Sequence, residues 1–186
     1  FIITGNGALS DLTGVNATQV SVVLTPTGPG QITVTIPANT VVDAANNSNT
    51  EAVVFVWTYD NTGPTMTITA TNGSGTAVAD GAISSDTSLT VIFTSSKATA
   101  NFAASDITVS GGAISNFTAT SSTVYTATFT PSAAGVTTID VTANTFTDTY
   151  GNSNTAADQF NWRYETSVPF MNITAANSSG LSIQDS

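Results

Sequence analysis

The chain contains no cysteine and no histidine among its 186 residues. The absence of cysteine excludes disulfides and thiolate metal sites. Histidine is the most frequent general acid or base in enzymes and the cysteine thiol a common nucleophile, so the usual parts of a catalytic site are missing. No pair of carboxylates shows the pattern of a shared glycosidase cleft either. We therefore expect a protein that is not an enzyme.

Positive charge is almost as scarce. Lys97 and Arg163 are the only basic residues, against twelve acidic ones, and the net charge is −10. Nucleic-acid binding requires clusters of Lys and Arg that neutralise phosphates, and docking on an anionic membrane face requires the same. No apolar run approaches the roughly 18 residues that span a bilayer. The sequence therefore predicts neither a nucleic-acid partner nor membrane insertion.

Threonine and serine are abundant instead, with 36 and 21 copies. Strand signals recur about every eight to twelve residues between Gly, Pro and Asn turns, and no segment has helical periodicity. In residues 87–94, for example, Leu89, Val91 and Phe93 alternate with mostly polar residues. The same alternation marks residues 65–71, 123–130 and 137–142. About seven or eight such strands predict an antiparallel β-sandwich.

The sequence also repeats itself. After a shift of 105 residues, residues 1–81 align with residues 106–186 without a gap, and 31 of the 81 pairs are identical. A gapless period of this length is typical of tandem domains. It divides the chain into the C-terminal part of one repeat (1–63), a complete repeat (64–168) and the start of a third (169–186). We expect the chain to be a window on a longer polypeptide.

Aromatic residues recur at one spacing in the last strand of both repeats. Phe55, Trp57 and Tyr59 align with residues 160, 162 and 164, which are again Phe, Trp and Tyr. Such a row can form a sugar-stacking platform, or it can fill the core of a sandwich. Large aromatics at alternating positions are typical of cores, so we expect this face to be buried.

Several segments resemble the bacterial Ig-like (Big) repeats of large cell-surface and adhesin-type proteins. They are the runs 106–120 (DITVSGGAISNFTAT) and 123–131 (TVYTATFTP), and Thr147-Asp148 followed by Gly151-Asn152-Ser153-Asn154. Asp60-Asn61-Thr62-Gly63-Pro64 resembles the Asp-x-Thr-x-Pro linker between modules of such arrays. The resemblance implies an all-β fold of tandem Ig-like antiparallel β-sandwich domains, each of about 105 residues.

The second linker departs from this pattern. The counterpart of residues 60–64 reads Glu165-Thr166-Ser167-Val168-Pro169. Proline is kept and restricts the preceding residue to extended conformations. Glu165 replaces an Asp and Val168 replaces a Gly, so a ligand role of the first linker does not transfer directly to the second.

Calcium is the metal that the acidic loops favour. Ca²⁺ takes six to eight oxygen ligands from carboxylates, amides and carbonyls. The candidate ligands are the loop and linker acids Asp43, Asp60, Asp80, Asp86 and Asp148. We expect the turn with Asp80 and Asp86 to face the first linker, and the family resemblance implies that Ca²⁺ often stiffens such junctions. The alternative is that these Asp and Asn residues only form turns, since no loop has EF-hand spacing.

Asparagine also supplies candidate glycosylation sites. Asn-x-Ser/Thr sequons occur at Asn16, Asn46, Asn72, Asn116, Asn172 and Asn177. With 16 Asn and 57 Ser or Thr among 186 residues, about five are expected by chance. The sequons are therefore not enriched.

Two classes of function remain open. The first is a structural spacer in a long extracellular surface protein, which forms a rod, filament or adhesin stalk. Its partners are neighbouring repeats and, through open sheet edges, copies of itself. The second is a binding module that grips a surface glycan or a protein with loops at one end of the sandwich. Both place the protein outside the cell.

Overall fold

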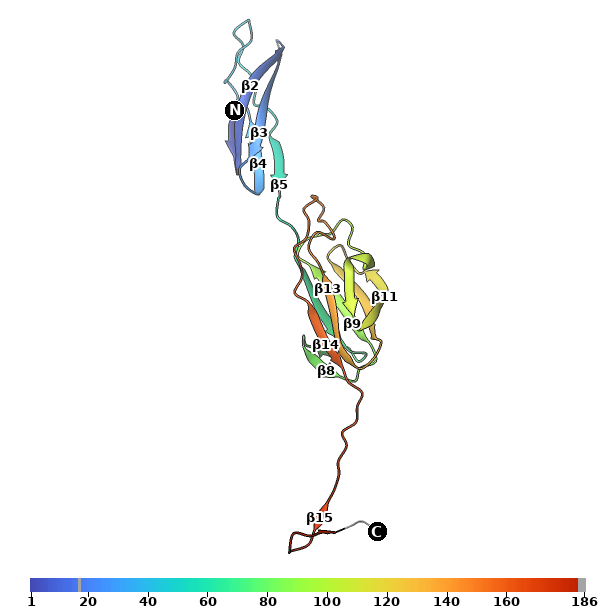
Figure 1. The fold of residues 1–186 in the computed structure, drawn as a ribbon. Coiled ribbons are helices and arrows are strands. Elements are labelled where there is room, and N and C mark those ends of the chain that lie inside the picture. Colours follow the sequence, from blue (N-terminus) through green and yellow to red (C-terminus); the bar gives the residue numbers. More distant parts are fainter. Residues whose placement is uncertain (17, 184–186) are drawn as a thin grey trace.

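The computed structural model describes residues 1–16 and 18–183, and these residues form short strands joined by turns (Figure 1). The described residues contain no α-helix, only a single 3-10 turn at Ala104–Asp106. Period-two patterning and β-branched residues explain this, because they suit a pleated surface with one buried face. Within this described part, no helix is both long enough and apolar enough to cross a membrane.

Residues 66–164 form a sandwich of two sheets. The five-stranded sheet has the order β11-β12-β9-β6-β7, with bounds Gly112–Ala119, Val124–Pro131, Leu89–Ser95, Met66–Thr71 and Ala77–Val78. The four-stranded sheet has the order β10-β13-β14-β8, with bounds Ile107–Ser110, Gly135–Val141, Phe160–Tyr164 and Ala82–Ser84. The sandwich predicted for this part of the chain is confirmed.

The prediction of a wholly antiparallel sandwich is wrong at one edge. Strand β8 pairs in parallel with β14, matching Ala82 with Trp162 and Ser84 with Tyr164. We expected a plain turn between Asp80 and Asp86, but its middle residues form this edge strand. The N–H and C=O groups of β8 form hydrogen bonds with β14, whereas a buried turn would leave these backbone groups unpaired.

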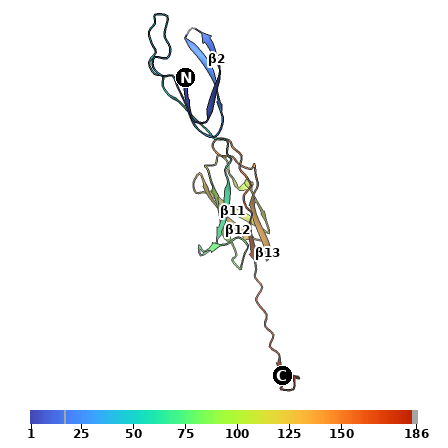
Figure 2. The ribbon, with the colours of Figure 1, turned by 90° about the vertical axis from the view of Figure 1, so that its left-hand side faces the viewer.

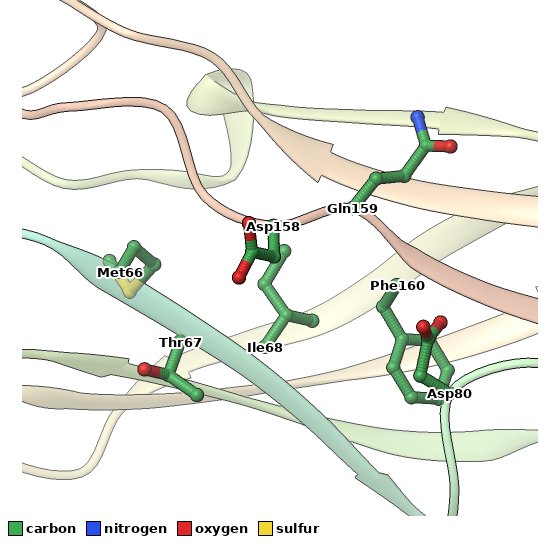
Figure 3. Close-up of a pocket in the computed structure, with 7 residues that line it drawn as sticks. All are labelled: Met66, Thr67, Ile68, Asp80, Asp158, Gln159 and Phe160. Carbon is green, nitrogen blue, oxygen red and sulfur yellow. The ribbon is translucent and has the colours of Figure 1, made fainter.

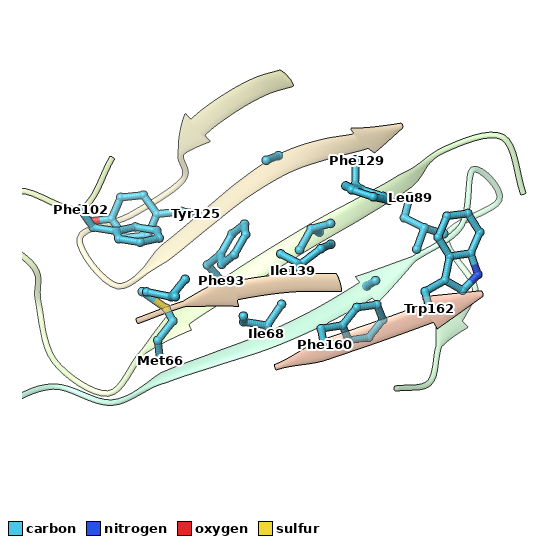
Figure 4. Packing of buried hydrophobic residues seen from close by; sticks show 14 of the residues in the cluster. Met66, Ile68, Leu89, Phe93, Phe102, Tyr125, Phe129, Ile139, Phe160 and Trp162 are labelled. Carbon is cyan, nitrogen blue, oxygen red and sulfur yellow. The ribbon is translucent and has the colours of Figure 1, made fainter. Parts of the chain in front are cut away.

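The core lies between the two sheets of this sandwich (Figure 4). Inward residues of β9 and β12 are fully buried, with Phe93 and Phe129 at 0% exposure. At one end Phe102 packs edge-on against Tyr125 and Phe146, with ring centroids 5.0 Å apart in both cases. The inward positions predicted by the alternation on β6, β9, β12 and β13 are confirmed as buried, and Phe146 is buried beside them at 1% exposure.

Residues 1–59 form a smaller set of strands that correspond to β10–β14 of the sandwich. One sheet has the order β1-β4-β5, with bounds Ile2–Thr4, Gly30–Thr35 and Phe55–Tyr59, and β2 (Gly7–Asn16) pairs with β3 (Gln19–Pro26). The register of β2 with β3 matches that of β11 with β12 after the shift of 105, from Gly7–Pro26 to Gly112–Pro131. The register of β4 with β5 matches that of β13 with β14 in the same way.

The aromatic face of β5 is not buried as predicted. Phe55 is 56% exposed and Trp57 36%, whereas Phe160 and Trp162 are 3% and 1% exposed. The sandwich of residues 66–164 covers its aromatic face with β6 and β9, and the described part of residues 1–59 contains no counterpart of either strand. Core-type side chains of β5 therefore line an open apolar hollow with Leu9, Leu24 and Val34.

The C-terminal residues form one hairpin. Strand β15 (Ala175–Ala176) pairs with β16 (Ser182–Ile183), in the register of β6 with β7 after the shift of 105. Asn177 accepts the N–H groups of Ser179 and Leu181, as Asn72 accepts those of Ser74 and Thr76. The turn is thus encoded locally by Asn and the positive-φ glycine, Gly75 or Gly180.

Candidate functional junction

The first linker, residues 60–65, meets two segments of the following sandwich where β5 passes into β6. They are residues 95–97 at the end of β9 and the loop 148–155 after β13. Figures 1 and 2 show the linker at one end of the complete unit and the following linker at the other end. This junction collects several of the charged and amide side chains of the chain.

Lys97 is the central cation of the junction. Its Nζ lies 2.6 Å from Oδ2 of Asp60 and 3.5 Å from Oδ2 of Asp148, and it also donates to the carbonyl of Thr62. Asp148 is only 1% exposed, while the side chains of Lys97 and Asp60 are 28% and 20% exposed. The ammonium therefore pairs with two carboxylates, one of which is buried, and the three groups together keep a net charge of −1.

The Asp148 loop is folded by its own side chains. Oδ1 of Asp148 accepts the N–H groups of Tyr150 and Asn152, both at 2.9 Å. Asn152 in turn donates from Nδ2 to Asp148 Oδ2 and to the carbonyl of Asp60, both at 3.1 Å. Asp and Asn favour such turns because their short side chains bond to nearby backbone groups.

Asn154 closes the base of this loop. Its Oδ1 accepts the N–H groups of Thr145 and Phe146, and its Nδ2 donates to the carbonyls of Thr142 and Thr155. The residue is 2% exposed and all of its hydrogen-bonding capacity toward the backbone is used. This explains why an amide, rather than an apolar residue, occupies this position.

Residues 39–50 fold the corresponding loop in the same way. Asp43 accepts the N–H groups of Ala45 and Asn47, and Asn47 donates to Asp43 at 3.0 Å. Asn49 accepts from Thr40 and Val41 and donates to Pro37 and Thr50. These are the partners of Asp148, Asn152 and Asn154 shifted by 105 residues, so the repeated Asn-Ser-Asn-Thr sequence encodes one loop conformation.

Hydrogen bonds and ion pairs set the charge state of these groups. The hydrogen bond from Lys97 lowers the pKa of Asp60, and Asp60 raises the pKa of Lys97. Burial raises the pKa of Asp148, but the side-chain and backbone hydrogen bonds of Asn152 and the N–H of Tyr150 outweigh it, so the pKa is lowered. The side chain of Asn47 lowers the pKa of Asp43. All three carboxylates are therefore ionised at neutral pH.

The candidate calcium ligands are only partly brought together. Asp60 and Asp148 share Lys97, whereas Asp43 lies in its own loop in the first repeat. Across residues 1–16 and 18–183, no group of three or more acidic side chains is arranged to hold a metal ion. The junction is thus a pair of carboxylates around an ammonium.

Asp80 and Asp86 do not face the first linker as expected. Asp80 accepts the N–H of Asn161 at 2.6 Å, and Asp86 accepts the hydroxyl of Ser84 at 2.6 Å. Ser84 also accepts the N–H of Glu165 through its carbonyl, which places this turn beside the second linker. The reason is the parallel pairing of β8 with β14, which carries the turn to the far end of the sandwich.

A shallow hollow lies between β6 and the segment that leads into β14 (Figure 3). It is lined by Met66, Thr67, Ile68, Asp80, Asp158, Gln159 and Phe160. Figure 3 shows Asp158 near Ile68 and Asp80 near Phe160, so the two carboxylates lie apart along the hollow. Because Asp80 is already bonded to Asn161, this arrangement does not resemble a paired-carboxylate site.

The sequon asparagines differ in exposure. Asn16, Asn46, Asn116, Asn172 and Asn177 are exposed, and Asn72 is half-buried. Asn46 and Asn116 adopt positive φ, 65° and 51°, as is common for asparagine in turns. Attachment of sugars at these positions stays a prediction.

Sequence reasoning missed Lys97 and Gly63 as junction residues. The rarity of basic residues is a usable signal for Lys97, because a lone lysine in an acidic chain has many possible carboxylate partners. The change from Gly63 to Val168 between the two linkers is the signal for Gly63. Neither signal identifies which residues make contact, because the partners lie 35 or more positions away.

The model of the bacterial Ig-like domain family matches residues 60–164, more than half of the chain. The match begins at Asp60 and therefore includes the first linker. Comparisons with curated proteins and with solved structures gave no match. Domains of the matched family usually occur in surface-exposed proteins and are generally non-catalytic. With its sandwich at residues 66–164 and a family match over most of its length, the chain belongs to the bacterial Ig-like domain family.

Proposed function

We propose that this chain is a structural spacer from a long extracellular surface protein, built from bacterial Ig-like units in tandem. Residues 1–63 are then the end of one unit, and residues 169–186 the beginning of another. The single observation that carries this proposal is that structure recurs at an offset of 105 residues on both sides of the complete unit. The strand register of β2 with β3 repeats that of β11 with β12, and the hairpin of β15 and β16 repeats that of β6 and β7. Such an array extends a functional end from the cell surface.

The position of the two linkers supports an extended array. The chain enters the complete unit after β5 and leaves it after β14, and the two linkers lie at opposite ends of the sandwich (Figure 1). Units connected in this way follow one another in a row and do not fold back on each other. A row of this kind separates a terminal domain from its anchor by a distance proportional to the number of units.

The surface chemistry fits an exposed spacer. The described surface of the complete unit is dominated by Thr, Ser and Asn, and the chain contains only two basic residues. Most sites for trypsin-like proteases are therefore missing. The outward side chains also offer few charges for non-specific binding.

The alternative is a binding module that uses the end loops to grip a glycan or a protein. The Asp148–Thr155 loop is the best placed candidate, but its Asp and Asn side chains are already engaged with the backbone and with the first linker. The same loop sequence recurs in the first repeat, whereas binding loops usually diverge between units. These observations favour the spacer.

Electron microscopy of the intact parent protein tests the proposal. We expect a thin rod of beads whose length rises in proportion to the number of repeats. We also expect a labelled antibody against the protein to bind intact cells, because the spacer lies on the cell surface. A compact particle, or a protein found only inside the cells, would contradict it. Glycan-array binding by residues 64–168 alone would favour the binding module instead.

A further inference from the structure

The first linker is in contact with the complete unit over nearly its whole length. The carboxylate of Asp60 and the carbonyl of Thr62 accept from Lys97, and the carbonyl of Asp60 accepts from Asn152. Pro64 accepts the N–H of Thr155, at 3.1 Å, through its carbonyl. Thr65 exchanges bonds with Ser96 through both its N–H and its carbonyl, both at 2.9 Å. A free connector would leave these groups to water.

Gly63 makes the closest approach in this linker. A Cβ placed on Gly63 would lie 2.0 Å from the carbonyl oxygen of Ser153, a backbone atom that cannot move aside cheaply. Gly63 is not among the glycines with positive φ, so the requirement is space and not backbone conformation. The next residue, Pro64, is fully buried. The position thus excludes every residue except glycine while the linker is docked.

We propose that the complete unit carries a docking socket for its own N-terminal linker. The socket holds that linker rigid, and docking requires the carboxylate of Asp60 and the absence of a side chain at Gly63. The socket consists of Lys97, Ser96 and the Asn152–Thr155 segment. Lys97 is its latch, because its ammonium joins the linker carboxylate to the buried Asp148. The family match, which begins at Asp60, supports a linker that belongs to the domain it precedes.

The socket makes the first junction stiff. Strand β5 ends at Tyr59 and the docked contacts begin at Asp60, so no free residue is left between the first unit and the complete one. Motion between the two units then requires the linker to leave its socket. This consequence holds whether the array serves as a spacer or presents a binding end.

The second linker cannot dock in the same way. Val168 stands where Gly63 stands, and a valine side chain at position 63 would overlap the Ser153 carbonyl. Glu165, the counterpart of Asp60, accepts instead from Ser167, Thr166 and Arg163 of its own neighbourhood. The second linker therefore lacks the two residues, Asp and Gly, on which docking of the first linker depends.

Backbone ¹⁵N relaxation of the full chain tests the socket. We expect order parameters of about 0.85 for residues 60–65, like those of β6. We expect values below about 0.6 for residues 166–170, the reference for a linker with no counterpart of Lys97 or Asn152 to bond within these 186 residues. In the Gly63→Val variant the values for residues 60–65 should fall toward that reference. The matched control is Gly73→Val, because a Cβ at Gly73 meets nothing within 4 Å.

A second variant covers the case in which Gly63→Val fails to fold. Lys97→Met keeps the length of the side chain and removes the ammonium, and it should mobilise residues 60–62 while the amide signals of β9 and β12 stay in place. Low order parameters in the first linker of the unmodified chain would overturn the proposal. So would a first linker that stays rigid in both variants while the sandwich remains folded.

Discussion

Asn154 is the residue on which the junction loop most depends. Its side chain is 2% exposed and bonds two backbone N–H groups and two carbonyls between Thr142 and Thr155. Removal of the Asn154 amide would leave these backbone N–H and C=O groups without their hydrogen-bond partner. Each buried group left unsatisfied lowers the free energy of unfolding by about 1–3 kcal/mol. The amide thus contributes to the fold and not to a reactive site.

We therefore predict that Asn154→Ala lowers the free energy of unfolding of the complete unit by about 2–4 kcal/mol. Denaturant unfolding of residues 64–168 followed by the emission of Trp162 measures the change. Ser153→Ala is the control, since Ser153 is exposed and the structure gives its side chain no hydrogen bond. Equal stability of the two variants would contradict the role assigned to Asn154.

The ion pairs of the junction predict a plateau of stability around neutral pH. The folded-state pKa values of Asp60 and Asp148 lie below the ordinary value of 3.8, so their contribution is complete above that pH and is lost as the pH falls through the lowered values. The pKa of Glu165 is lowered by the Ser167 hydroxyl from 4.5 to about 2, so its contribution fades across that interval. The pKa of Lys97 is raised above 10.5, so its contribution is lost only as the pH rises beyond that value.

Thermal unfolding across the pH range measures this plateau. We expect a nearly constant midpoint between about pH 5 and pH 9 and a decline below about pH 4. In Lys97→Met the acid decline should be smaller, because part of the lowered pKa of Asp60 is lost with the ammonium. A midpoint that changes steadily between pH 5 and pH 9 would contradict the assignment.

At the scale of elements, the strands of the complete unit were largely predictable. Period-two alternation identified β6, β9, β12 and β13, because each has one face in the core. The short edge strands β7 and β8 were not predicted. Two or three residues give no period, and the pairing of β8 is decided by partners such as Trp162, about 80 positions away.

The junction was only partly predictable. The repeat marked Asp148, Asn152 and Asn154 as one loop, since these positions are identical in both units. The sequence did not indicate that Lys97 would lie between Asp60 and Asp148, because the contact joins segments from three parts of the chain. The expected position of Asp80 and Asp86 was wrong for the same reason, since it depends on the sheet edge that β8 joins.

Calcium at the junction is tested at this scale. The Lys97 ammonium already occupies the space between Asp60 and Asp148, so a divalent cation would have to displace it. We predict that the melting midpoint of the full chain is the same in EGTA and in millimolar Ca²⁺. A midpoint raised by Ca²⁺ and restored by EGTA would instead support the calcium site expected from the sequence.

On the scale of the whole molecule, the open apolar hollow of residues 1–59 is the feature that most needs an explanation. Leu9, Leu24, Val34, Phe55 and Trp57 line it, and their counterparts in the complete unit belong to the core or pack against it. The counterparts of β6 and β9 would cover it in a complete unit. The tandem account therefore explains an exposed apolar surface that a single isolated domain would not carry.

A chimera that restores these strands tests the tandem account most directly. Residues 64–105 are joined in front of Phe1, because residue 105 precedes the counterpart of Phe1 in the repeat. Acrylamide quenching then reports on Trp57, since Trp162 is only 1% exposed in the parent chain. We predict that Trp57 becomes protected and that its emission shifts to the blue, as the added strands close the first sandwich. Emission and quenching of Trp57 unchanged from the parent chain, with the added segment folded or not, would contradict the claim that residues 1–63 are the end of a second Ig-like unit.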